Sequence, residues 1–233
     1  MKKKALPQLF IYDLDGTLID SVPSISQAIN LALQETFAIT APEALVRSWV
    51  GNGSKMLASR AHTYAKQTLG EAATTSHTLD ALHHGFLHHY ACHINNPNPV
   101  FEGVRTLLNR IDCAGIAQAI ATNKPQQFVP ALLKNAGLVP YVSAIVGGNS
   151  LPERKPHPMP LEYLCRRFNC QPHQAIMIGD SESDAMSAQR AGMPCWLVEQ
   201  GYSQGIDLHK LGAQKVFKDM QVLLSHVETL FSR

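Results

Sequence analysis

Six short, nearly continuous apolar runs restrict the fold of this chain more than any other feature of its sequence. They span residues 9–12, 117–121, 144–146, 175–178, 195–198 and, more weakly, 215–217. Continuous rather than alternating hydrophobicity is typical of parallel strands that are covered on both faces. Helical patterns separate the later runs. This alternation predicts an α/β fold with a doubly wound parallel sheet, that is, a Rossmann-like core.

The interval between the first two runs breaks this rhythm, because its roughly one hundred residues contain no convincing strand. It carries helical patterns of apolar residues instead, at Ile25, Ile29 and Leu33, at Ala44 and Leu45, at Met56, Leu57 and Tyr64, and at Leu79, Leu82, Phe86 and Leu87. A simple crossover between parallel strands needs far less chain. We therefore expect an all-helical cap domain at residues 20–96, inserted into an α/β core of residues 1–19 and 97–233.

The composition excludes several classes of protein. The 233 residues include 20 basic and 18 acidic ones, a balance that does not favour nucleic-acid binding. No stretch approaches the roughly 18 apolar residues of a membrane span, and the basic residues Lys2–Lys4 are not followed by the apolar run of a signal peptide, so we expect a solvated tail. The cysteines, odd in number and without a Cys-x-x-Cys motif, favour free thiols in a reducing cytoplasm. They are Cys92, Cys113, Cys165, Cys170 and Cys195.

Polar side chains follow the first four of these runs, close to the point where each strand is expected to end. They are Asp13 and Asp15, then Thr122, Asn123 and Lys124, then Lys155, and finally Asp180 and Asp184. The carboxyl ends of parallel strands meet at one edge of a sheet, where α/β proteins bind their ligands. Clustered carboxylates repel one another unless a cation joins them, and oxygen donors without Cys or His favour Mg²⁺.

This set of groups suits phosphoryl transfer. Mg²⁺ prefers to share a phosphate oxygen, the Thr122 hydroxyl can donate to a phosphoryl oxygen, and Lys155 can neutralise developing charge. The backbone N–H groups of residues 14–16 can form an anion-binding nest. The sequence therefore predicts a Mg²⁺-dependent enzyme whose partner is a small phosphorylated molecule.

Four segments resemble the motifs of the haloacid dehalogenase superfamily of phosphatases, in the right order and at strand ends. They are Asp13-x-Asp15-Gly16-Thr17, Thr122, Lys155 and Gly179-Asp180-x-x-x-Asp184. The helical insert is similar to the first type of cap in that superfamily. Further stretches, at residues 20–23, 49–53, 122–125 and 147–158, resemble bacterial phosphoglycolate phosphatases.

The resemblance implies roles for individual residues. Asp13 would attack phosphorus and form an aspartyl-phosphate, and Asp15 would serve first as general acid and then as general base. Thr122 and Lys155 would complete the catalytic set. Mg²⁺ would be held by the Asp13 carboxylate, the Asp15 carbonyl and the Asp180 carboxylate, with support from Asp184.

Substrate contacts are expected from both domains. In the core they would come from Gly16, Thr17, Asn123 and Lys124. In the cap they would come from the small-residue loop Gly51, Asn52 and Gly53, flanked by Arg47 and Lys55. Either flanking cation could meet the carboxylate of 2-phosphoglycolate, although both could equally be solvated surface charges.

Several alternatives stay open from the sequence. The same chemistry could act on a sugar phosphate or on pyrophosphate, and a mutase is disfavoured but not excluded. A dehalogenase would need no acid at Asp15, and a phosphonate hydrolase would need a Schiff-base lysine for which Lys55 and Lys66 lack the right neighbours. A non-catalytic binding protein of this fold is the remaining class, and we expect a monomer or a homodimer.

Two local patterns have competing interpretations. His84 and His88, like His89 and His93, are spaced four apart as metal ligands on a helix would be, but a polar helix face is the favoured interpretation. Asp180 could cap the helix that follows it, although Ser181 or Ser183 is the better candidate for that position.

Overall fold

The computed structural model describes residues 6–232, except for the side chains of residues 73, 76 and 77. The basic residues Lys2–Lys4, for which we expected a solvated tail, lie outside this range. No helix of the described part is long and apolar enough to cross a membrane.

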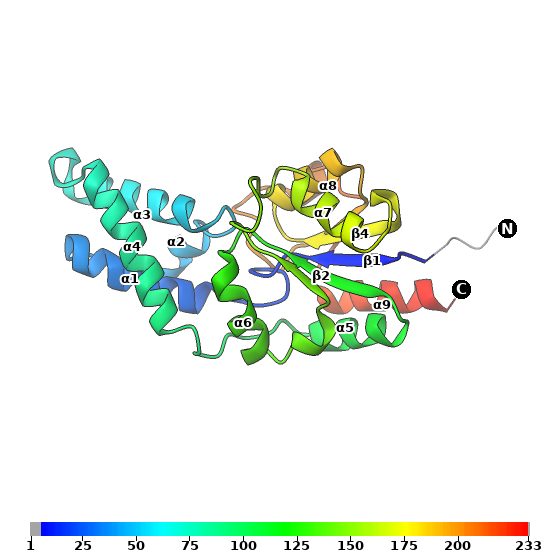
Figure 1. Cartoon of the computed structure of the whole chain (residues 1–233). Coiled ribbons are helices and arrows are strands. Elements are labelled where there is room, and N and C mark those ends of the chain that lie inside the picture. The colour runs from blue at the N-terminus through cyan, green and yellow to red at the C-terminus, as the bar shows by residue number, and fades with distance from the viewer. Residues whose placement is uncertain (1–5, 233) are drawn as a thin grey trace.

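A parallel sheet with the strand order β3-β2-β1-β4-β5-β6 forms the centre of the molecule (Figure 1). Its strands are β1 (Leu9–Tyr12), β2 (Ala117–Ala121), β3 (Ala144–Val146), β4 (Ala175–Gly179), β5 (Cys195–Val198) and β6 (Lys215–Phe217). The order reverses direction next to β1, as in doubly wound sheets. The predicted doubly wound parallel sheet is thereby confirmed, and every expected run forms a strand.

Helices cover both faces of this sheet. One face carries α5 (Val104–Cys113), α6 (Val129–Asn135) and α9 (Met220–Phe231), and the other carries α7 (Met159–Arg167) and α8 (Glu182–Ala191). Short 3₁₀ turns complete the connections; they are η1 (Glu71–Ala73), η2 (Gln126–Phe128), η3 (Val139–Tyr141), η4 (Pro172–Gln174) and η5 (Leu208–Lys210).

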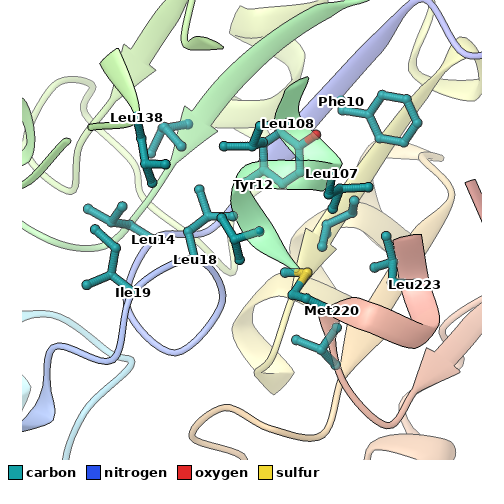
Figure 2. Packing of buried hydrophobic residues seen from close by; sticks show 14 of the residues in the cluster. Phe10, Tyr12, Leu14, Leu18, Ile19, Leu107, Leu108, Leu138, Met220 and Leu223 are labelled. Atoms are coloured by element: carbon teal, nitrogen blue, oxygen red, sulfur yellow. The ribbon is translucent and has the colours of Figure 1, made fainter. Parts of the chain in front are cut away.

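The central strand β1 shows why its run is apolar throughout. Its side chains alternate between two hydrophobic clusters, because successive residues of a strand point to opposite faces. Phe10 and Tyr12 pack toward α5 and α9 (Figure 2), whereas Leu9 and Ile11 pack toward α7 and α8. All four side chains are fully buried.

The interval between β1 and α5 is helical, as expected. It contains α1 (Val22–Phe37), α2 (Glu43–Arg47), α3 (Ser54–Leu69) and α4 (Ser76–Cys92), which lie together beside the carboxyl ends of the strands (Figure 1). Residues such as Ile29, Leu33 and Leu82 give this insert a hydrophobic cluster of its own. The domain boundaries at residues 20 and 96 stay a prediction.

The sequence analysis did not identify α9. Asp219 is the N-cap of this helix, and its side chain accepts a hydrogen bond of 2.9 Å from the Val222 N–H. The helix buries Met220, Leu223 and Val227. It packs beside α5 and completes the cover of one sheet face (Figure 2).

Replacing Leu107 by alanine should lower the free energy of unfolding by about 2–5 kcal/mol, because its side chain is fully buried between α5 and the sheet. Urea denaturation measures the change. Leu31→Ala, on the exposed side of α1, is the matched control and should cost less than about 1 kcal/mol. Equal effects of the two substitutions would show that the α5 face is not a packed core.

Candidate active site

The expected polar residues meet at the carboxyl edge of the sheet. Asp13 extends β1, since its N–H donates to the Ile178 carbonyl at 2.9 Å, and Thr122 extends β2 in the same way toward Val146 at 3.0 Å. Asp180 directly follows β4. These side chains are almost fully buried, as are those of Lys155 and Asp184.

Lys155 lies at the centre of this cluster. Its ammonium Nζ is 3.1 Å from Asp13 Oδ1 and 2.6 Å from Asp184 Oδ1. Burial alone would lower the pKa of Lys155, but the charges of the two carboxylates outweigh burial and the pKa is raised. The side chain therefore stays an ammonium and holds both carboxylates in place.

Three carboxylates and one ammonium leave this cluster with two uncompensated negative charges when all are ionised. One oxygen from each of Asp13, Asp180 and Asp184 lies within 4.8 Å of the others. Burial, reinforced by neighbouring carboxylates, raises the pKa of Asp13 to about 7 and also raises the pKa of Asp180. A buried set of oxygen donors that is short of positive charge fits a hard divalent cation.

Hydrogen bonds orient the carboxylates of Asp180 and Asp184. Asp180 Oδ1 accepts from the Thr17 hydroxyl at 2.6 Å, and its Oδ2 accepts from the Tyr202 N–H at 2.6 Å. Asp184 Oδ2 accepts from the Ser181 hydroxyl at 2.6 Å and from the Ser181 N–H at 3.1 Å. Ser181 is the N-cap of α8 in a capping box with Asp184, which confirms the preference for Ser181 over Asp180 at that position.

Asp15 belongs to a separate ion pair. Its Oδ1 accepts from the Ser21 hydroxyl at 2.6 Å, and Lys124 Nζ lies 3.0 and 3.1 Å from its two oxygens. Lys124 is buried and retains its charge, because Asp15 outweighs the effect of burial and raises the lysine pKa. The carboxylate of Asp15 is thus held apart from the Asp13, Asp180 and Asp184 cluster.

Gly16 allows the loop after β1 to approach Asp180. Its φ of +86° lies in the left-handed region, and a Cβ at this position would come within 2.3 Å of Asp180 Oδ2. Only glycine fits this turn.

A pocket of about 480 Å³, part of it open to solvent, lies between this edge and the helical insert. The core contributes Asp13, Asp15, Thr122, Asn123, Lys124, Pro125 and Phe128. The insert contributes Ile25, Val50, Gly51, Gly53, Ser54, Leu57, Phe86 and Tyr90. The core residues therefore form a charged floor of the pocket, and the insert residues form a largely apolar roof.

The chain matches the haloacid dehalogenase-like hydrolase family over residues 10–198. It belongs to this family. It is 37% identical to a phosphoglycolate phosphatase of Psychrobacter arcticus, over 94% of this chain and 95% of that protein. It is 36% identical to a phosphoglycolate phosphatase of Mannheimia succiniciproducens, over 94% of this chain and 98% of that protein. The crystal structure of a predicted phosphoglycolate phosphatase from Haemophilus somnus superposes with a TM-score of 0.88 at 32% identity, covering 94% of this chain and 97% of that chain.

The structure distributes the expected cap residues of this family member over different environments. Gly51 and Gly53 line the pocket, whereas the Asn52 side chain accepts hydrogen bonds from Arg60 at 2.9 Å and from Gln204 at 3.1 Å. Lys55 lines a neighbouring cavity together with His83 and Arg154.

Arg47 lies away from the pocket as well. Its guanidinium is 3.4 Å from Asp20 Oδ1 and stacks over the Tyr202 ring at 5.3 Å from the ring centre. Tyr202 was not expected from the sequence. Its hydroxyl donates to Asp20 at 2.6 Å and accepts from the N–H groups of Ser21 and Val22 at 2.9 and 3.3 Å. Through these contacts Arg47 stabilises the segment where the insert begins.

Each of the four histidines that have the spacing of metal ligands, three on α4 and His93 at its C-cap, lies close to another group. His84 Nδ1 and His93 Nδ1 lie 2.8 Å from backbone carbonyls one turn earlier, and His89 Nε2 lies 2.8 Å from Glu35. His88 Nε2 is 3.8 Å from Cys92 Sγ. Among the described residues, Asp13, Asp180 and Asp184 form the only group of three or more such side chains that could hold a metal ion. The polar-face interpretation of the histidines stays a prediction.

Removing the Asp13 charge should stabilise the metal-free protein more at high pH than at low pH. The folded-state pKa of about 7 exceeds the unfolded value near 3.8, so ionised Asp13 opposes folding, and this cost is absent well below pH 4 and complete above pH 7. The stability of Asp13→Asn relative to wild type should therefore be greater at pH 8 than at pH 6 by about 1 kcal/mol.

Urea denaturation in the presence of a chelator at both pH values measures this difference. Asp112→Asn, at an exposed position of α5, is the control and should show no such pH dependence. A difference between Asp13→Asn and wild type that is the same at pH 6 and pH 8 would contradict a raised Asp13 pKa.

Proposed function

We propose that this chain is a Mg²⁺-dependent phosphomonoester hydrolase that converts 2-phosphoglycolate to glycolate and phosphate in the cytoplasm. The observation that carries the chemistry is the buried Asp13 carboxylate, which is paired with Lys155 and lines a pocket together with Asp15. The relatives named phosphoglycolate phosphatase, which match nearly the whole chain, support the substrate. The cysteines, all free thiols, fit a reducing compartment.

In the first step an Asp13 carboxylate oxygen attacks the phosphorus atom, and the bond between phosphorus and the ester oxygen breaks. The Leu14 N–H donates to Asp13 Oδ1 at 2.7 Å and orients the carboxylate. Asp15, in its protonated form, transfers a proton to the departing alkoxide, so the alcohol leaves neutral. Lys155 and the Thr122 hydroxyl offset charge on the phosphoryl oxygens.

In the second step water attacks the phosphorus of the aspartyl-phosphate. Asp15, now a carboxylate, takes a proton from this water, and the bond between phosphorus and the Asp13 oxygen breaks. This step forms inorganic phosphate and restores the Asp13 carboxylate. The hydrogen bond from Ser21 keeps Asp15 at the pocket floor in both steps, and Lys124 pairs with Asp15 whenever Asp15 is a carboxylate.

The donor set fits Mg²⁺. Asp13 and Asp180 would hold it together with the Asp15 carbonyl, and Asp184 would orient the site through Lys155 and Ser181. When bound, Mg²⁺ supplies positive charge next to the transferring phosphoryl group. The fit rests on the oxygen-only ligands and on the missing positive charge that raises the pKa of Asp13 and Asp180.

Wild-type protein should hydrolyse 2-phosphoglycolate faster than a sugar phosphate or pyrophosphate, and only when Mg²⁺ is present. Asp13→Asn should retain less than about 1% of the rate, because an amide is a poor nucleophile. Phosphate release across this panel, with Asp112→Asn as control, tests the proposal. Hydrolysis by Asp13→Asn near the wild-type rate would exclude Asp13 as the nucleophile, and a preference for another ester would exclude the substrate.

Asp15→Asn should slow alkyl esters more than aryl esters in the phosphorylation step. General acids contribute roughly 10²- to 10⁴-fold, but a good leaving group such as 4-nitrophenolate departs without a proton. Rapid-quench measurement of aspartyl-phosphate formation separates this step from hydrolysis. If both ester classes lost the same factor in the first step, Asp15 would not be the general acid.

A further inference from the structure

Tyr90 reaches from the helical insert into the active-site pocket. It lies on α4, and only 2% of its surface is exposed. Its ring packs edge-on against Phe128, with ring centres 5.0 Å apart, and beside Phe86 at 5.6 Å. Lys124 Nζ lies 4.5 Å from the ring centre on the pocket side. These contacts fix the direction in which the hydroxyl points.

The buried hydroxyl of Tyr90 has no hydrogen-bond partner of normal geometry, although it interacts electrostatically with Lys124. Buried polar groups are nearly always paired, so an unpaired one in a pocket calls for an explanation. Burial raises the pKa of Tyr90, so the hydroxyl keeps its proton and can donate it in a hydrogen bond. Asn123 Oδ1 is the other unpaired side-chain atom of the described pocket residues, but it can only accept.

The other side chains in the roof of the pocket offer little to an anionic ligand. Ile25, Leu57 and Phe86 are apolar, and the Ser54 hydroxyl lies 3.0 Å from His83 Nε2, with which it is hydrogen-bonded. The Tyr90 hydroxyl is therefore the free side-chain donor that the insert places in the pocket, among the residues that the structure describes.

Lys124 connects this hydroxyl to the proposed chemistry. Its Nζ contacts both oxygens of Asp15 and also lies over the Tyr90 ring. The ester oxygen of a substrate must reach Asp15 to receive a proton. In 2-phosphoglycolate one carbon separates that oxygen from the carboxylate, so the carboxylate comes close to Lys124 and to the hydroxyl above it.

We propose that the Tyr90 hydroxyl, together with the Lys124 ammonium, binds the carboxylate of a small phosphorylated hydroxy acid and so determines substrate specificity. This inference rests on the proposed function and adds the residues that recognise the non-phosphate end of the substrate. A hydroxyl donor in a largely apolar roof, close to an ammonium of the floor, favours an anion over a neutral group of the same size. The cap residues Arg47 and Lys55 lie outside this pocket and are not needed for it.

Tyr90→Phe removes the hydroxyl and keeps the ring. The test compares kcat/KM for 2-phosphoglycolate with kcat/KM for ethyl phosphate, in which a methyl group replaces the carboxylate. The ratio of the two values should fall at least tenfold in Tyr90→Phe, mainly through a higher KM for 2-phosphoglycolate. Tyr64→Phe is the matched control, because the Tyr64 hydroxyl bonds to the Thr40 carbonyl away from the pocket, and it should keep the wild-type ratio.

Binding provides a second readout that does not depend on turnover. In the Asp13→Asn background, titration calorimetry should give a Kd for 2-phosphoglycolate that Tyr90→Phe raises about tenfold, and a Kd for inorganic phosphate that changes far less. A merely structural role for Tyr90 would weaken both ligands to the same extent.

The outcomes separate the two proposals. Hydrolysis of neither ester by wild type would overturn the proposed function and this inference with it. Hydrolysis of both esters by wild type, with a ratio that Tyr90→Phe leaves within twofold, would leave the phosphatase intact and overturn the role of Tyr90. A selective loss on 2-phosphoglycolate in both kinetics and binding would establish it.

Discussion

The architecture of this protein depends on a buried cluster of three carboxylates, of which the single ammonium of Lys155 compensates only one charge. The Lys155 ammonium lies between Asp13 and Asp184, and Asp180 adds a further carboxylate to the same edge of the sheet. Bringing these groups out of water costs several kcal/mol each, and the raised pKa of Asp13 shows that Lys155 alone does not offset that cost. The fold tolerates the cluster because parallel strands and the N-terminus of α8 supply donors around it, and because the cluster is suited to a divalent cation.

Two ion pairs with different roles lie side by side in this arrangement. The first joins Lys155 to the carboxylates that face the proposed metal and phosphoryl group, and the second joins Lys124 to Asp15. The two carboxylates of the Asp-x-Asp motif have different partners, although only one residue lies between them. The proposed nucleophile and the proposed acid therefore have different cationic partners, Lys155 and Lys124.

The sequence predicted the core far better than the insert, for a physical reason. Buried parallel strands must be apolar along their whole length, so all six runs are strands, and the polar residues after them meet because the sheet topology forces them together. Positions such as Arg47 and Asn52 follow no such rule. Arg47 pairs with Asp20, and Asn52 accepts hydrogen bonds from Arg60 and Gln204. Neither these tertiary contacts nor the unpaired Tyr90 hydroxyl produce a periodic pattern in the sequence.

Tyr202 ties two distant parts of the molecule together. Its N–H orients Asp180, while its hydroxyl holds Asp20, Ser21 and Val22 at the point where the chain leaves the sheet for the helical insert. A rotation of the insert about that junction must either break these three hydrogen bonds or carry Tyr202 along and disturb the carboxylate. Tyr202 therefore links the insert to Asp180, so a movement of the insert at this junction would also displace the carboxylate that is proposed to bind the metal.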